Sequence, residues 1–173
     1  AGMVLGALPF GFHYAFVRTK FLSINLTKEV VAYFCILTIF CILFIFSIED
    51  NWLDSVFNMV SASTTTGFST ITMDNLNPMA FTVVIIAMII GGCGFSTTGG
   101  IKISRFMELT KVRQIFYKKH AKISESDRKG IISGIIILAP LLILPLIVAA
   151  HMASIGYDFQ NAFFDGVSAI TTT

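Results

Sequence analysis

Charged residues are scarce in this chain, at 13% of 173 residues against roughly 25% in an average soluble domain, while 55% are hydrophobic. Cysteine is also scarce, and Cys35, Cys41 and Cys93 all lie in apolar stretches without a C-x-x-C pair. The hydrophobic balance excludes a disordered chain and almost any soluble globular domain. The cysteine spacing argues against a disulfide framework or a zinc site. The composition therefore indicates a membrane protein.

Three uncharged segments are long enough to cross a bilayer, which takes about 20 helical residues. They are Val30–Ile48, Ala80–Ile101 and Ile131–Ala150. The apolar residues 1–14 are too short for a separate crossing, and we interpret them as the end of a preceding transmembrane helix. We therefore expect an all-α membrane protein that forms part of a longer chain.

Lysine and arginine are absent from two of the connections between these segments. All 12 lie in residues 15–29 or 102–129, whereas residues 49–79 and 151–173 hold six acidic residues and no lysine or arginine. Cytoplasmic loops of membrane proteins are enriched in lysine and arginine. We therefore expect a multi-pass protein of the plasma membrane, with residues 15–29 and 102–129 in the cytoplasm.

A repeat with an offset of 107 residues underlies this arrangement. Residues 57–66 (FNMVSASTTT) and 164–173 (FDGVSAITTT) match at seven of ten positions. Internal repeats in membrane proteins usually mark symmetry about a pathway. The expected units are a cytoplasmic link at 15–29, a complete span–pore-helix–span repeat at 30–102, a basic cytoplasmic link at 103–130, and the span, pore helix and partial filter of the next repeat at 131–173.

The external residues 55–73 carry no charge, although both of their ends are expected outside the membrane. We expect a short helix, capped by Asp54, to enter the membrane as far as about Ser63, and residues 64–70 to return in extended form. The negative helix end, the carbonyl groups and the threonine hydroxyls would favour a cation there. Gly67 would permit the backbone angles that this path requires. An ordinary external loop rich in serine and threonine is the alternative.

Five glycines and three consecutive hydroxyl residues interrupt the second span, in Gly91–Gly100 (GGCGFSTTGG). A helix would lose about 0.8–1 kcal/mol per glycine relative to alanine. We therefore expect a broken helix whose irregular loop lies in the ion path and acts as a gate. Close helix packing through small residues is the alternative. A phosphate-binding loop is disfavoured, because Gly100 and Ile101 stand where that motif has lysine and serine or threonine.

Two segments carry a resemblance to a known family: residues 61–69 (SASTTTGFS) and 91–102 (GGCGFSTTGGIK). Together with the order of the repeats, they resemble the Trk/Ktr/HKT superfamily of potassium transporters, most closely its TrkH-type pore-forming subunit. The resemblance covers nearly the whole chain. It implies four span–pore-helix–span repeats around one pore, of which this chain holds the end of the second, the third and the start of the fourth.

The resemblance also implies roles for individual residues. The ion-binding selectivity filter would comprise Thr64, Thr65, Thr66, Gly67, Phe68, Thr171, Thr172 and Thr173. The gate would comprise Gly91, Gly92, Gly94, Ser96, Thr97, Thr98, Gly99 and Gly100. It further implies K⁺ as the transported ion, with Na⁺ as the other candidate, and a homodimer in the lipid bilayer with a cytosolic nucleotide-binding regulatory subunit of TrkA type. We expect no enzymatic activity, no cofactor and no nucleic-acid partner.

The sequence thus predicts the pore-forming subunit of a K⁺ uptake system. An ion-coupled secondary transporter is the alternative, because broken helices near the membrane midplane also bind substrates and coupling ions. Both copies of the threonine-rich segment are expected to face outside, which favours a pore built from parallel repeats. Dependence of the flux on a second ion would distinguish the coupled transporter from the pore.

Overall fold

The computed structural model describes residues 1–19, 24–48, 51–71, 76–107 and 125–173. Within these ranges the chain is helical, and the β pairing is limited to an isolated bridge between Ile90 and Ile101. The expected all-α class is therefore confirmed. Parts of the two expected cytoplasmic links, 20–23 and 108–124, lie outside the described residues.

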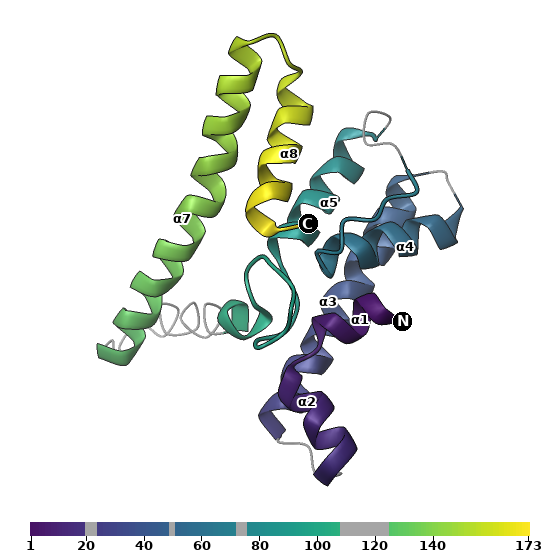
Figure 1. Cartoon of the computed structure of the whole chain (residues 1–173), viewed down its shortest axis with the longest axis vertical. Helices are drawn as coiled ribbons and strands as arrows, with labels where there is room; N and C mark the ends of the chain where they lie inside the picture. Colours follow the sequence, from purple (N-terminus) through teal and green to yellow (C-terminus); the bar gives the residue numbers. More distant parts are fainter. Residues whose placement is uncertain (20–23, 49–50, 72–75, 108–124) are drawn as a thin grey trace.

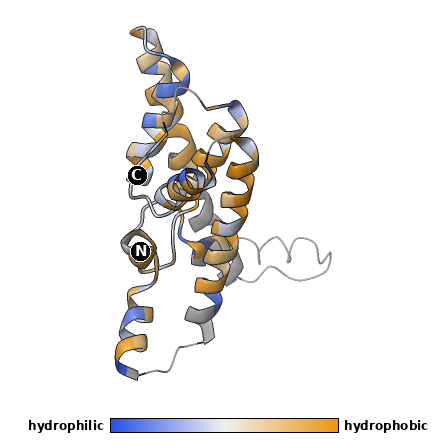
Figure 2. Ribbon diagram, turned by 90° about the vertical axis from the view of Figure 1, so that its right-hand side faces the viewer, coloured by the Kyte–Doolittle hydropathy of each residue, from blue (hydrophilic) through white to orange (hydrophobic). Residues whose placement is uncertain are grey.

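Hydrophobic residues predominate along the helices (Figure 2). By length and composition, one described stretch, Lys28–Ser47, is suited to crossing a bilayer. Pro78–Ile89 and Ala139–Ser154 are shorter apolar helices. Of the expected spans, Ala80–Ile101 is helical only as far as Ile89, whereas Ile131–Ala150 lies wholly within a helix.

The N-terminal residues form two short helices instead of one continuous helix end. Helix α1 (Gly2–Ala7) stops at Leu8, which is extended, and α2 (Phe10–Tyr14) begins after Pro9 and continues into the π-helix η1 (Ala15–Thr19). Proline disfavours the helical conformation of the residue before it, which explains the break. The break allows α1 to pack against the helix Trp52–Ser63 (α4).

Helices α3 (Ile24–Ser47), α4 (Trp52–Ser63) and α5 (Pro78–Ile89) pack against one another. Helix α3 begins six residues before the uncharged segment at 30–48, so its charged first turns are helical too. The buried core between the three helices includes Phe44, Met59, Val84 and Met88. Because Met59 of α4 belongs to this core, the core holds α4 in place against α3 and α5.

The start of α4 differs from the expectation. Asn51 caps the helix, because its side-chain oxygen accepts a hydrogen bond from the Leu53 N–H at 3.3 Å. Asp54 lies in the first turn, so the expected cap at Asp54 is wrong. Asparagine and aspartate cap helices about equally well, which lets the earlier of the two take the position. The helix ends at Ser63, as expected.

Helices α7 (Glu125–Ser154) and α8 (Phe159–Thr171) pack side by side, as Figure 1 shows. Asp158 caps α8 by accepting a hydrogen bond from the Asn161 N–H at 3.1 Å. Pro140 and Pro145 lie inside α7, and Gly166 of α8 lies against the Pro145 backbone. Helix α8 also contacts α5, which brings the two threonine-rich segments together.

Candidate ion-conduction site

The chain leaves α4 through a tight threonine turn. The Thr64 hydroxyl donates to the Val60 carbonyl at 2.7 Å and lies 2.7 Å from the Thr66 hydroxyl. The Thr66 N–H donates to the Ser61 carbonyl at 3.0 Å. Thr65, between them, has a positive φ of 51°. Such a conformation is uncommon for a β-branched residue, and here these hydrogen bonds hold it.

The end of α8 repeats this turn. The Thr171 hydroxyl donates to the Val167 carbonyl at 2.9 Å and lies 2.9 Å from the Thr173 hydroxyl. The Thr173 N–H donates to the Ser168 carbonyl at 3.0 Å, and Thr172 has a φ of 58°. The two copies in the sequence therefore share a local hydrogen-bond pattern as well as residue types.

The two threonine turns face each other. Gly67, with a φ of 80°, follows the first turn, and a Cβ atom built there would lie 3.0 Å from the Thr173 carbonyl carbon. Figure 1 shows the ends of α4 and α8 converging beside α5. The expected filter residues of the two repeats are thus neighbours in space. Thr64 and Thr171 are buried, whereas Phe68 is 63% exposed and Thr66, Gly67 and Thr172 are exposed as well.

Asn58 ties the returning chain to α4. Its amide nitrogen donates to the Asp54 carbonyl at 2.7 Å and to the Thr70 hydroxyl at 2.8 Å. Its amide oxygen accepts from the Ser69 hydroxyl and from the Thr70 N–H, both at 3.0 Å. Asn58 itself is only 5% exposed, whereas its partners Ser69 and Thr70 are exposed, so the four hydrogen bonds are part-buried. Asn58 therefore holds the return segment at a fixed distance from the helix.

The sequence reasoning did not single out Asn58. A signal was nevertheless present, because the repeat aligns Asn58 with Asp165, so both copies place a polar residue at the same point of a mostly apolar helix. Asp165 is exposed. A polar position shared by both copies is a reason to expect a hydrogen-bonding role.

Replacing Asn58 with leucine should destabilise the filter region, because it leaves the Thr70 N–H without its acceptor. We expect the free energy of unfolding of the full-length protein to fall by about 2–4 kcal/mol. Asn58→Asp keeps the acceptor oxygen but turns an oxygen towards the Asp54 carbonyl in place of the donor, so it should destabilise the region as well. Thermal unfolding in detergent measures both variants, and an Asn58→Leu protein as stable as the parent would show that this hydrogen-bond network is dispensable.

The glycine-rich segment leaves the helical conformation after Ile89, and helical residues resume at Ile103. The Gly91 N–H donates to the Ile101 carbonyl at 3.0 Å, and the Ile101 N–H donates to the Ile89 carbonyl at 2.7 Å. These bonds close the neck of a loop over residues 91–100. Gly100 has a φ of 65°, and a side chain there would lie 2.7 Å from the Met88 carbonyl oxygen. The neck therefore requires glycine.

This loop lies directly against both threonine turns. The Gly99 N–H donates to the Thr65 hydroxyl at 2.8 Å. A Cβ atom on Gly99 would overlap the carbonyl oxygen of Thr171. A pocket of about 510 Å³ lies beside this contact, lined in part by Thr64, Thr65, Thr66 and Thr97. The loop thus meets hydroxyl-rich backbone from both copies of the repeat at one place.

The expected gate residues point in different directions. Ser96 and Thr98 turn inward, with their hydroxyls 2.8 Å apart, and the Thr98 hydroxyl accepts from the Gly92 N–H at 3.0 Å. Thr97 is exposed, and its hydroxyl donates to the Gly6 carbonyl of α1 at 3.0 Å. Gly94 lies next to Glu29 of α3, a residue that the sequence reasoning did not place at this site.

Comparison with known proteins places these features in a family. The family model described as "TrkH: Cation transport protein" matches residues 12–173. An uncharacterized cation transporter of Methanocaldococcus jannaschii is 33% identical over 96% of this chain, which corresponds to 37% of that protein.

Two further relatives have potassium uptake in their names. Ktr system potassium uptake protein B of Vibrio alginolyticus is 28% identical over 70% of this chain and 28% of its own length. Trk system potassium uptake protein TrkI of Halomonas elongata is 25% identical over 97% of this chain and 38% of its own length. The chain therefore spans less than two fifths of each relative, and these relatives are transporters rather than enzymes. On the family match over nearly its whole length, the chain belongs to the TrkH family of cation transport proteins.

Proposed function

We propose that this chain forms part of the pore of a K⁺ uptake system. Monovalent cations would pass a filter lined by Thr64–Phe68 and Thr171–Thr173, and the loop Gly91–Gly100 would gate the path. The observation that carries the proposal is the contact of Gly99 with the Thr65 hydroxyl and the Thr171 backbone. A loop in that position obstructs the path beside the two turns when it is in place and opens that path when it moves.

The chemistry of the turns supports a cation rather than an anion. Carbonyl and hydroxyl oxygens can replace the hydration shell of a cation. Helices α4 and α8 both end at the turns, so their partial negative charges favour a cation between them. The two turns share one hydrogen-bond pattern, as repeated pore-helix units around one pathway would require.

We propose the remaining features of the whole transporter from the charge distribution and from the family resemblance. The basic segments 15–29 and 102–129 would face the cytoplasm, and the connections that lack lysine and arginine would face outside. The full-length protein would form a homodimer in the bilayer. Residues 102–129 would lie on the side where a cytosolic nucleotide-binding regulatory subunit binds.

Ion flux into liposomes tests the proposal. The full-length parent protein is reconstituted, and uptake of Rb⁺ and Na⁺ is followed at a set membrane potential, with empty liposomes as the control. We expect Rb⁺ uptake that exceeds Na⁺ uptake and follows the electrochemical gradient. Uptake that requires a second ion in a fixed ratio would overturn the pore and favour an ion-coupled transporter.

A further inference from the structure

Lys102 directs its ammonium group into the glycine-rich loop. The ammonium nitrogen donates to the Ser96 carbonyl at 3.2 Å and to the Thr98 carbonyl. It also lies 3.4 Å from the Ser96 hydroxyl and 3.2 Å from the Thr98 hydroxyl. An ammonium group has three donors, and here it has four oxygens within reach. Ser96 and Thr98 of the loop therefore surround the ammonium group of Lys102, which follows the loop in the sequence.

Glu29 of α3 holds a second part of the same loop, next to Cys93 and Gly94. Its carboxylate accepts a hydrogen bond from the Gly94 N–H, and its carbonyl accepts a weak one from the Cys93 thiol at 3.9 Å. Cys93 is fully buried. A charge-assisted hydrogen bond of this kind is about twice as strong as a neutral one. Two side chains of opposite charge therefore bond different residues of the same loop.

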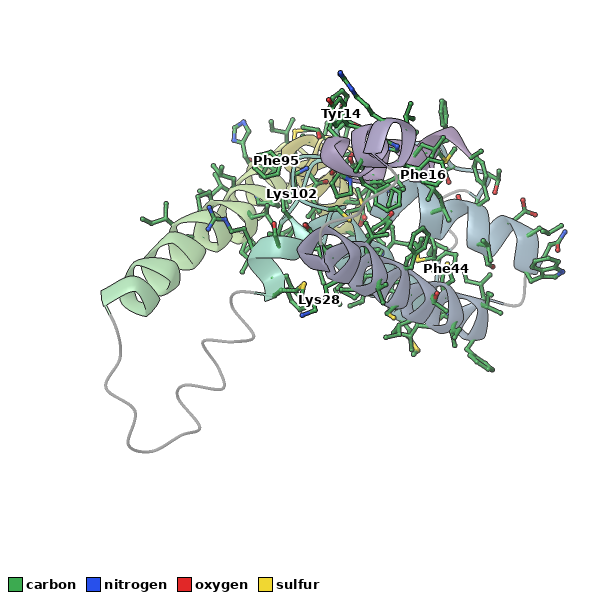
Figure 3. The ribbon with its side chains drawn as sticks, turned by 90° about the horizontal axis from the view of Figure 1, so that it is seen from below. Tyr14, Phe16, Lys28, Phe44, Phe95 and Lys102 are labelled. Atoms are coloured by element: carbon green, nitrogen blue, oxygen red, sulfur yellow. The ribbon has the colours of Figure 1, made fainter. Side chains whose placement is uncertain are left out.

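The position of Lys102 differs from that of Lys28. Lys28, next to Glu29 on α3, is exposed, whereas Lys102 is half-buried. Figure 3 shows Lys102 in the crowded region of side chains and Lys28 at the lower edge of a helix ribbon. Taking a lysine charge out of water is unfavourable unless hydrogen bonds compensate for it. The loop oxygens supply that compensation only while the loop is in place.

We propose that Lys102 and Glu29 form a latch that keeps the glycine-rich loop against the threonine turns. Lys102 fixes the segment from Ser96 to Thr98, and Glu29 fixes Gly94. Both act as positioning residues and touch no transported ion. The proposal rests on the function proposed above, since the loop must obstruct the path for the latch to control flux. Release of either side chain favours the open path.

Two methionine variants in the full-length protein test the latch. Lys102→Met removes the ammonium and keeps an unbranched side chain that is one atom shorter, and Lys28→Met makes the same change at the exposed lysine. We expect Lys102→Met to raise Rb⁺ flux by about tenfold, the change that loss of one hydrogen bond to a charged group produces in an equilibrium. The Rb⁺ to Na⁺ ratio should stay at the parent value, because the filter is untouched. Lys28→Met should match the parent.

Alkylation of Cys93 gives a second readout that does not depend on transport. A maleimide is added to the reconstituted protein, and modification of the Cys93 peptide is followed by mass spectrometry. Loop release should speed alkylation in Lys102→Met and in Glu29→Gln, and the double variant should exceed the faster single variant only slightly. A purely supporting role would lower thermal stability without raising flux.

The outcomes separate the latch from the pore. Absence of Rb⁺ flux in the parent would overturn the proposed function, while faster Cys93 alkylation in the variants would still support a latched loop. Parental flux and parental alkylation in an inserted Lys102→Met protein would overturn the latch. Should Lys102→Met fail to insert, Glu29→Gln decides, since it keeps the acceptor oxygen and removes only the charge. An unchanged flux and alkylation rate there would reject the proposal.

Discussion

Deleting Ser96–Thr98 from the full-length protein should raise Rb⁺ flux by roughly tenfold or more, as expected when a mostly closed two-state element is shifted towards its open state. The deletion removes the oxygens that Lys102 contacts and the hydroxyl that accepts from the Gly92 N–H. The neck between Ile89 and Ile101 keeps its own hydrogen bonds, so the flanking helices retain their anchor. Liposome flux measures the effect.

A variant of unchanged length controls for the deletion. Replacing the same three residues with alanine removes their hydroxyls but leaves the backbone in place, so it should raise flux less. Both proteins must insert and purify like the parent. Unchanged or abolished flux in a correctly inserted deletion variant would count against a gating role for the loop.

Replacing Gly67 with serine should abolish the preference for Rb⁺ over Na⁺. The residue has a φ of 80°, and an added Cβ atom would lie 3.0 Å from the Thr173 carbonyl carbon. Adopting this backbone costs a residue with a side chain about 1–3 kcal/mol. Relief of that strain requires either this segment or the facing turn to move, and the oxygens would no longer match one ion size. The ratio of Rb⁺ to Na⁺ flux reports the change.

Gly156 provides a matched control for this substitution. It also has a positive φ, of 100°, but nothing lies within 4 Å of the position that a Cβ atom would take. Gly156→Ser therefore introduces similar backbone strain at the turn between α7 and α8, away from the filter. It should keep the parental selectivity. Equal loss of selectivity in both variants would attribute the effect to strain in general.

Local features of the fold could be predicted from the sequence. The end of α4 at Ser63 and the break at Gly91 follow from runs of poor helix formers and from glycine content. The repeat was visible because identical residue types recur, and the same threonine turn follows each helix. The sequence does not distinguish Asn51 from Asp54 as the cap of α4, because asparagine and aspartate cap helices about equally well.

The long-range contacts could not be predicted in this way. Gly99 and Thr65 are 34 residues apart, and Gly94 and Glu29 are 65 apart. No periodicity in the sequence links such pairs, because packing of α3, α4 and α5 brings them together. In the sequence, Lys102 is only the last residue of the segment 91–102 and the first residue of the basic segment 102–129. The contacts of its ammonium group with the loop form only when the loop is folded.

Ion density in the filter tests the central proposal most directly. The full-length protein is crystallised in Rb⁺ and in Na⁺, and anomalous difference maps are calculated at the rubidium edge. Coordination by Thr64–Gly67 and Thr171–Thr173 predicts a rubidium peak between the two turns, on the side of the filter away from the Gly99 loop. Rubidium peaks found only elsewhere, in a protein that transports Rb⁺, would contradict it.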